Sequence, residues 1–238
     1  MRRSFISMTW TPGVELEDAQ TMVRTVEDVY GILRRSFGEP GQFDPLPIVR
    51  VFGSWTIPAC PPHAVYGSMD WFVTHSLDDT GKRISAARFL ENVRLEPWQA
   101  NNPHLDLCMT EHVVVDDRGS TASPLEVMGV SQRALASLIS LSPLDSIANP
   151  DLRKLAIRHV VAHFLGLLFD VPIVNRTEHV VERDGDLFCL HECAMRYTDS
   201  SSAALAFAQQ QAASNQIFCD ACQRDLLAQV VGFHYGLN

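Results

Sequence analysis

The chain has 238 residues, 46% hydrophobic and 20% charged, the composition of a globular chain of one domain, or of one domain with an appendage. This composition excludes a disordered or fibrous protein, and a chain of this size can build its core without disulfides or metals. The formal net charge of −9 excludes nucleic acid as an expected partner, because binding phosphate backbones requires an excess of Lys and Arg.

The sequence also lacks the segments that direct a chain into or across a membrane. Residues 1–11 contain no apolar run typical of a secretory signal, and no stretch has the roughly 18 to 20 apolar residues of a membrane span. We therefore expect a cytoplasmic chain with no membrane partner. In that compartment thiols stay reduced, so the six cysteines indicate metal binding or no special role rather than a disulfide framework.

The first two thirds of the chain alternate between helical and strand patterns. Apolar spacing predicts a helix over Glu17–Phe37, ended by Gly38–Gly41, and a second helix over Ser85–Trp98. Short β-rich runs predict strands at Ile48–Phe52, Trp71–His75, Leu105–Met109, His112–Val115 and Glu126–Val130. Leu135–Leu141 fits a strand or a helix. This alternation predicts an α/β (α+β) fold.

The last third changes character after one long helix. This helix is predicted over Leu152–Leu168, with Asp151 as its cap and Gly166 near its end. Beyond it the chain is polar and mixed until the Ser/Ala/Gln tract Ser200–Ser214, which can form a helix. We expect an N-terminal α/β subdomain, residues 1–168, and a smaller irregular C-terminal subdomain, residues 169–238.

Two histidines stand on the long helix. His159 and His163 are four residues apart, so their rings project from one face and could chelate one metal ion. Two histidines on an apolar helix are more often hydrogen-bonded core residues. The pair alone is therefore weak support for a metal site.

The cysteines give a stronger signal. Cys189 and Cys193 form one pair, Cys219 and Cys222 another, and four thiolates suffice for a closed tetrahedral zinc site. The alternative is four reduced, buried thiols that act as small hydrophobic groups. The paired spacing favours one structural zinc.

Taken in order, these motifs resemble the archaemetzincins, zinc metallopeptidases of the metzincin clan. The resemblance rests on H-x-x-x-H-x-x-G from His159 to Gly166, on Cys193-Ala194-Met195, and on Phe218-Cys219-x-x-Cys222, with weaker echoes at Gln42–Asp44, Met128–Val130 and Leu138–Leu141. It implies a metzincin-like mixed sheet with helices and a zinc-binding C-terminal part. It also implies that Met195 forms an apolar floor beneath the histidines, although a core methionine would look the same.

The departures from the family pattern bear on activity. That pattern is H-E-x-x-H-x-x-G-x-x-H-C; here Val160 stands at the position of the general-base Glu, Phe169 at the third His and Asp170 at the Cys. We interpret Cys189 as a substitute cysteine that follows an inserted segment, Val171–Phe188. The expectation is that the Phe169 ring fills the space of the lost ion, leaving the His159/His163 site empty or weakly occupied.

Three hypotheses follow. The first is a pseudo-metallopeptidase with a structural zinc and a remnant cleft for a peptide or protein. The second is a divergent, active zinc hydrolase that takes a base and a third ligand from the inserted segment; no spacing selects among Glu111, Glu178 and Glu192 as base or between His179 and His191 as ligand. The third is a metal-stabilised interaction module. The sequence does not indicate an oligomeric state.

Overall fold

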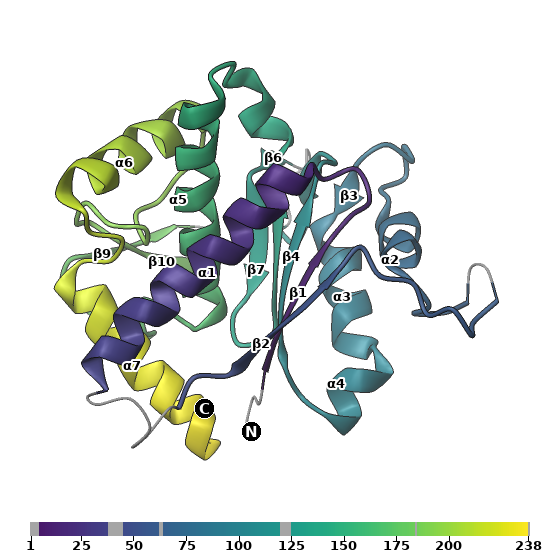
Figure 1. The fold of residues 1–238 in the computed structure, drawn as a ribbon, viewed down its shortest axis with the longest axis horizontal. Helices are drawn as coiled ribbons and strands as arrows, with labels where there is room; N and C mark the ends of the chain where they lie inside the picture. Colours follow the sequence, from purple (N-terminus) through teal and green to yellow (C-terminus); the bar gives the residue numbers. More distant parts are fainter. Residues whose placement is uncertain (1–4, 38–44, 62–63, 120–124, 184, 238) are drawn as a thin grey trace.

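The computed structural model describes residues 5–37, 45–61, 64–119, 125–183 and 185–237. At the centre lies a five-stranded sheet in the order β2-β1-β4-β8-β7 (Figure 1). The first four of these strands are parallel, and β7 runs antiparallel to β8. The strand bounds are β1 Phe5–Trp10, β2 Ile48–Gly53, β4 Leu105–Thr110, β7 Gly129–Gln132 and β8 Ala136–Ser140.

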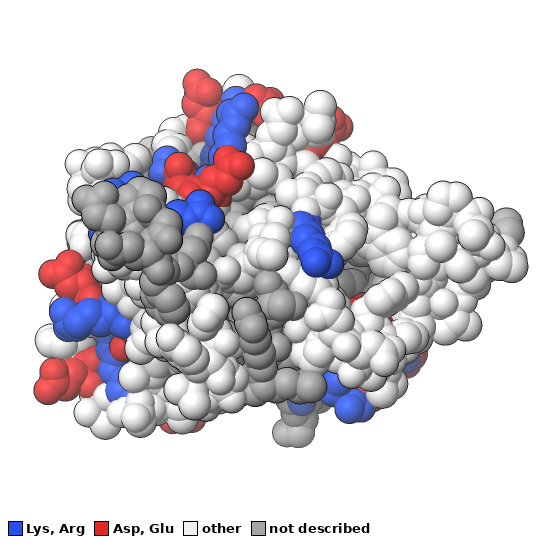
Figure 2. All heavy atoms as spheres, turned by 60° about the horizontal axis from the view of Figure 1, so that its bottom comes forward, with Lys and Arg blue, Asp and Glu red and all other residues white. Residues whose placement is uncertain are grey.

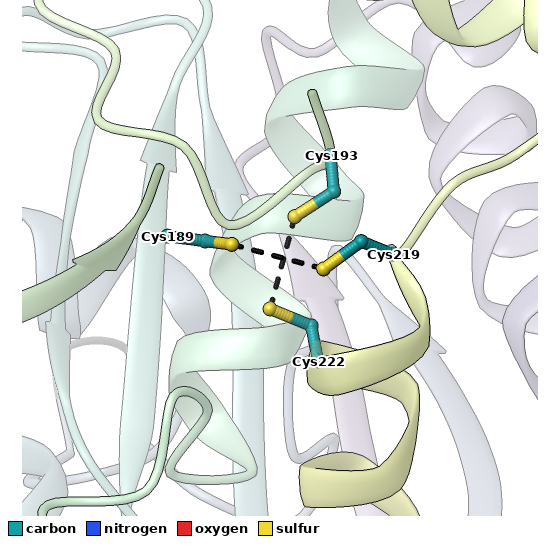
Figure 3. A group of neighbouring side chains, drawn as sticks. All are labelled: Cys189, Cys193, Cys219 and Cys222. Carbon is teal, nitrogen blue, oxygen red and sulfur yellow. Dashed lines mark hydrogen bonds between the residues drawn. The ribbon is translucent and has the colours of Figure 1, made fainter. Parts of the chain in front are cut away.

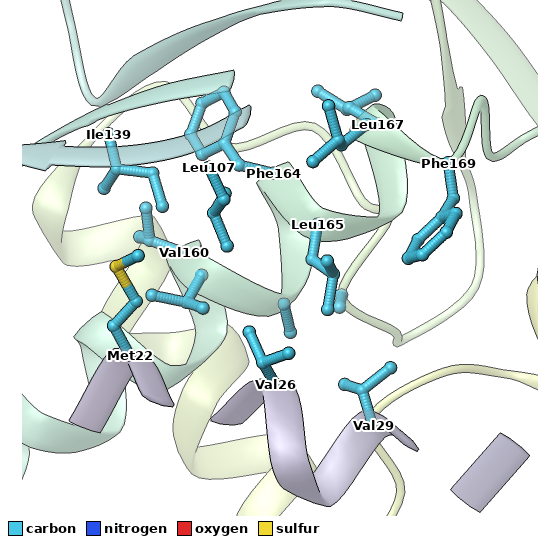
Figure 4. Packing of buried hydrophobic residues seen from close by; sticks show 14 of the residues in the cluster. Met22, Val26, Val29, Leu107, Ile139, Val160, Phe164, Leu165, Leu167 and Phe169 are labelled. Carbon is cyan, nitrogen blue, oxygen red and sulfur yellow. The ribbon is translucent and has the colours of Figure 1, made fainter. Parts of the chain in front are cut away.

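Two long helices, α1 (Leu16–Ser36) and α5 (Pro150–Leu168), pack against each other on one face of this sheet, and the short 3-10 helix η1 (Ser142–Ser146) precedes α5. Alternate side chains of β1 and β4, including Ile6, Met8 and Leu107, point to this face and join the apolar stripe of α1 in the main hydrophobic core. Figure 4 shows part of this core between the sheet and the two helices.

The opposite face of the sheet carries the helices α2 (Met69–Ser76), α3 (Ala86–Leu95) and α4 (Pro97–Asn101). A small sheet in the order β3-β5-β6 lies beside them, built from Ile84–Ser85, Val114–Asp116 and Leu125–Val127. The other set of alternate strand residues, such as Cys108, faces this second core. The sheet therefore separates two cores with different surroundings.

The C-terminal segment is more regular than the sequence suggested. It contains a hairpin of β9 (Val180–Arg183) and β10 (Asp186–Cys189), followed by α6 (Ser201–Ser214) and α7 (Asp220–Tyr235). α6 packs on α5, and α7 contacts α1. Apolar residues of this segment belong to the same main core as those of the first 168 residues, so the two parts share one hydrophobic core.

Several predicted elements need correction. Trp71–His75 is helical within α2, because the Ser68 hydroxyl accepts from the Trp71 N–H and caps a helix there. The helix predicted to run to Trp98 breaks at Glu96, which is extended because Pro97 follows it. The predicted strand Glu126–Val130 is two strands, β6 and β7, that belong to different sheets.

Other details of the long elements also differ. The cap of α5 is Asn149 rather than Asp151, with its side chain accepting from the backbone N–H groups of residues 151 and 152. Leu135–Leu141 is resolved as the strand β8 rather than a helix. The expected helix stop at Gly38–Gly41 and the motif echo at Gln42–Asp44 lie outside the described residues. In the part of the chain that the structure describes, no helix combines the length and apolarity needed to cross a membrane.

Candidate metal centres

Four cysteines of the C-terminal segment converge (Figure 3). Cys189 ends β10, Cys193 lies in the next loop, Cys219 precedes α7 and Cys222 lies in its first turn. The Sγ atoms of Cys189 and Cys219 are 3.7 Å apart, as are those of Cys193 and Cys222. A zinc tetrahedron with Zn–S bonds of about 2.3 Å has edges of about 3.8 Å, whereas a disulfide needs about 2.05 Å. The donors and their spacing therefore fit a closed zinc site.

A buried cation lies against these sulfurs. The Arg176 guanidinium donates to Sγ of Cys222 at 3.2 Å, to Sγ of Cys189 at 3.4 Å and to the Asp225 carboxylate at 3.1 Å. Its side chain is only 8% exposed. Hydrogen bonding with Cys193 lowers the pKa of Cys189. Because four thiolates around zinc leave a net negative charge, this guanidinium would stabilise a ligated form and orient two of its ligands.

The two histidines of α5 are buried and already hydrogen-bonded. Nδ1 of His159 is 3.2 Å from Oε1 of Gln211, and its Nε2 is 3.2 Å from Oγ1 of Thr198. Nδ1 of His163 lies 2.7 Å from the Ala194 carbonyl oxygen. Burial lowers the pKa of both histidines to about 4. Both rings are therefore neutral near neutral pH, and both nitrogens of His159 and Nδ1 of His163 have hydrogen-bond partners.

Within the described residues, no third ligand accompanies this pair. Groups of three or more His, Cys, Asp or Glu with ligand atoms within 4.8 Å of one another occur twice in that part of the chain, and neither group contains His159 or His163. His179 and His191 instead lie against each other, with ring centroids 4.5 Å apart and planes tilted by 42°, and both line a cavity that Cys219 also lines.

The three carboxylates considered as bases also have other surroundings. Glu178 and Glu192 are exposed to solvent. Glu111 is half-buried and lies 3.4 Å from the His112 ring, and it also accepts a hydrogen bond from the Thr11 hydroxyl. None of the three joins a described metal-ligating group.

The three positions at which the sequence departs from the family pattern take up different roles. Val160 is 2% exposed and packs in the main core beside Met22 and Ile139 (Figure 4). Asp170 accepts from the guanidinium of Arg133 at 3.0 Å. An apolar side chain therefore lies at Val160, and the Asp170 carboxylate is engaged by a cation.

The expectation for Phe169 was wrong. Its ring packs against Phe233 of α7, with centroids 6.0 Å apart, rather than into the space beside the histidines. The ring that stacks on His163 is Phe188, at 5.9 Å and nearly parallel. Phe169 is the C-cap residue of α5 and belongs to the main core together with Phe233 and the apolar residues of α1.

Met195 lies directly against α5. It is fully buried, and a Cβ added to Gly166 would collide with its Sδ atom. The glycine is therefore required by this close contact rather than by the helix end, since α5 continues to Leu168.

Sequence reasoning missed the residues whose side chains hydrogen-bond to the histidines and to the cysteine sulfurs: Thr198, Gln211 and Arg176. No short spacing links them to their partners, because each comes from another loop or helix. It also missed a buried cluster of Glu96, His104 and Asp106 on the other side of the sheet. The alternation His104-x-Asp106 before an apolar strand was the available signal.

Two solved structures resemble the whole chain. The crystal structure of archaemetzincin from Methanopyrus kandleri matches with a TM-score of 0.56 and 13% identity, over 96% of this chain and 96% of that chain. The crystal structure of a zinc-dependent peptidase from Methanocorpusculum labreanum matches with a TM-score of 0.54 and 14% identity, over 93% of this chain and 99% of that one. No protein-family model and no curated protein sequence match the chain. At these identities the likeness is one of fold, and it agrees with the motif order read from the sequence. The chain has the archaemetzincin fold along nearly its whole length.

Proposed function

We propose that the chain is an archaemetzincin-like protein that holds a structural zinc at its four cysteines and has lost peptide hydrolysis. The observation that carries the proposal is the state of the two histidines. Their rings are buried, hydrogen-bonded to Gln211, Thr198 and Ala194, and without a third His, Cys, Asp or Glu ligand among the described residues. Catalytic zinc sites usually have three protein ligands and an open position.

The absence of a base supports the same conclusion. A zinc peptidase needs a group that takes a proton from the attacking water and passes it to the leaving amine. The resemblance places Val160 at that position, and this side chain packs into the core with no titratable group. Losing a positioned base costs about 10²- to 10⁴-fold in rate.

The four cysteines would hold the zinc, and its chemistry there is structural. All four ligand positions of a tetrahedron are taken by sulfur, so no position remains for water or substrate. The zinc-dependent peptidase among the structural neighbours is in keeping with zinc as the metal. Arg176 donates to two of the four sulfurs and to Asp225, which holds the guanidinium in place.

The remaining role of such a chain is binding, and an extended peptide is the partner that we propose. β7 is an edge strand in the described five-stranded sheet, and an extended peptide can add to such an edge through backbone hydrogen bonds. The negative net charge and the pattern of the sequence give no support to nucleic acid or a membrane as partner.

The test is a difference in zinc content. Wild type and His163→Ala are dialysed against micromolar zinc, and we expect equal zinc per chain, with no zinc-dependent cleavage of a peptide library by either. The control His75→Ala changes an exposed histidine of α2 and shows how much zinc is lost when any histidine is removed. A loss of one whole equivalent in His163→Ala, together with cleavage by the wild type, would overturn the proposal in favour of an active hydrolase.

A further inference from the structure

A cavity of about 440 Å³ lies on the α2/α3 side of the sheet, away from both centres described above. Its walls are largely apolar and rich in aromatic side chains, and none of the four cysteines at residues 189–222 and neither histidine of α5 lines it. Figure 2 shows a hollow on this side of the molecule among mostly uncharged atoms, with a basic side chain at its rim. The aromatic lining residues are Phe5, Phe52, Trp55, Phe72, Phe89 and Trp98.

Three buried polar side chains meet in this apolar cavity. Glu96, His104 and Asp106 are 6%, 4% and 9% exposed, and all three line the cavity. Local sequence places each of them. Glu96 is extended at the joint between α3 and α4 because Pro97 follows, and His104 and Asp106 flank Leu105, so they share the face that Leu105 does not.

The spacing of the ligand atoms is that of a metal site. Nε2 of His104 lies 3.1 Å from Oε1 of Glu96 and 3.4 Å from Oδ2 of Asp106. Ligands about 2.1 Å from a tetrahedral zinc are about 3.4 Å apart. All three ligand atoms lie within 4.8 Å of one another.

The neighbouring groups hold these ligands in orientation. Nδ1 of His104 lies 2.8 Å from the Asn102 carbonyl oxygen, so it donates there and Nε2 is directed at the carboxylates. The side-chain amide of Gln99 donates to Oδ2 of Asp106 at 2.8 Å. A carbonyl behind a ligating imidazole and a donor behind a ligating carboxylate are the usual outer partners of a zinc site.

Charge favours a divalent occupant. An organic anion would meet two carboxylates, and a monovalent organic cation, which faces Arg50 as a metal ion does, would neutralise only one of them. A divalent metal ion neutralises both carboxylates and uses the imidazole as a neutral ligand, which suits zinc with its affinity for His nitrogen and carboxylate oxygen.

We propose that Glu96, His104 and Asp106 bind a zinc ion in this cavity, with an open coordination position that faces the aromatic walls. The ligand of that position is then a small apolar molecule with an oxygen or nitrogen donor. Without metal, the three side chains form a hydrogen-bonded ion pair in which Nε2 of His104 carries a proton. Zinc binding releases that proton to solvent, and the Nε2 lone pair forms the bond to the metal.

The experiment measures metal content and the spectrum of the cobalt-substituted protein. After dialysis at micromolar metal, Asp106→Asn is expected to contain one equivalent less than wild type, whereas Glu91→Gln, an exposed acid on α3, is expected to contain the same amount. The difference spectrum between wild type and Asp106→Asn should show cobalt bands without sulfur-to-metal charge transfer, which separates this site from the cysteines. Equal metal content in wild type and Asp106→Asn would overturn the proposal.

A second variant and a pair of hydroxamate probes test the proposal independently of the Asp106→Asn result. If Asp106→Asn fails to fold by circular dichroism, Glu96→Gln replaces it with the same expectation. Benzohydroxamate should change the cobalt difference spectrum at a concentration about tenfold or more below that needed for acetohydroxamate, because its ring is buried against the walls. Equal potency of the two probes would overturn the open, aromatic-facing position. His163→Ala leaves all these readouts unchanged, so this proposal and the proposed function fail separately.

Discussion

The cysteine centre and the histidine pair use residue types that bind zinc, yet their surroundings differ. At the cysteines, sulfur faces sulfur at 3.7 Å and the neighbouring cation Arg176 favours thiolates. At the histidines, an amide oxygen and a hydroxyl partner both ring nitrogens of His159, a backbone carbonyl partners Nδ1 of His163, and no third ligand of the described residues is directed at the pair. The residue types alone therefore do not make a metal site. A metal site requires several donors directed at one point and few competing partners.

The largest expected effect is loss of the cysteine centre. Cys222→Ser removes one thiolate of the tetrahedron, so we expect loss of one zinc and destabilisation on the order of 5 kcal/mol. Zinc analysis measures the loss of metal, and hydrogen exchange should show a larger increase in exchange rate for the amides of α7 than for those of β4. Cys60→Ser, which changes a half-exposed cysteine elsewhere, should behave as wild type. Full zinc content in Cys222→Ser would remove the contrast between the two centres.

A smaller effect is expected from placing a base beside the histidines. Val160→Glu buries a carboxylate in the main core and should destabilise the fold by about 3–5 kcal/mol. It should not produce peptidase activity, since the metal would still lack a third ligand. Val160→Ala, which buries no charge, should cost about 1–3 kcal/mol. Zinc-dependent cleavage by Val160→Glu would show that the histidine pair is a working metal site.

The pH dependence of stability distinguishes neutral buried histidines from exposed ones. Burial lowers the folded-state pKa of His159 and His163 to about 4 from the ordinary 6.5. As pH falls through 6.5 the unfolded chain binds protons first, so stability present above that pH is lost down to about pH 4. At about 1.4 kcal/mol per pKa unit, we expect a loss of about 2–4 kcal/mol for each histidine.

The matched control for that prediction is the double variant His159→Gln/His163→Gln, which has no imidazole at these positions. Urea unfolding at several pH values compares the two proteins. The stability difference should shrink as pH falls through this window, because carboxylates elsewhere titrate alike in both. A constant difference would mean that the histidines are accessible and protonate in the folded state.

The smallest effect tests the packing beneath the histidine helix. Gly166→Ala places a methyl group against Sδ of Met195 and should destabilise the fold by about 1–3 kcal/mol. Gly31→Ala, in the interior of α1, meets only the end of the Arg35 side chain at 3.5 Å and should be neutral or stabilising by about 0.5–1 kcal/mol. Thermal unfolding of both variants checks the difference. Equal behaviour would place Met195 outside close contact with the helix.

The sequence predicted what local patterns determine. The apolar period and Asn-Pro start indicated α5, and the two cysteine pairs indicated a group that the fold brings together. The order of the motifs indicated the archaemetzincin fold. Each of these depends on residues close in the chain, or on a motif order that survives when identity has fallen to 13%.

Long-range contacts were beyond that reasoning. Trp71–His75 has the composition of a strand, and its helical state depends on the Ser68 cap. Phe169 turns toward Phe233 of a helix that lies far along the chain. Glu96 meets His104 only because Pro97 breaks the helix between α3 and α4. The Phe169 contact depends on a distant part of the chain, whereas the Ser68 cap and Pro97 are local signals that the pattern of apolar residues outweighed.

The position of α6 between Cys193 and Cys219 has a consequence for the histidine pair. A zinc that joins these cysteines closes the intervening chain into a loop, and closure limits how far α6 can move from α5. α6 carries Gln211, whose side chain accepts the hydrogen bond from His159. We expect that a zinc bound at the cysteines would limit the movement of α6, so that its removal would weaken the Gln211 contact and admit water to His159. A metal at one centre would then help to keep the other buried.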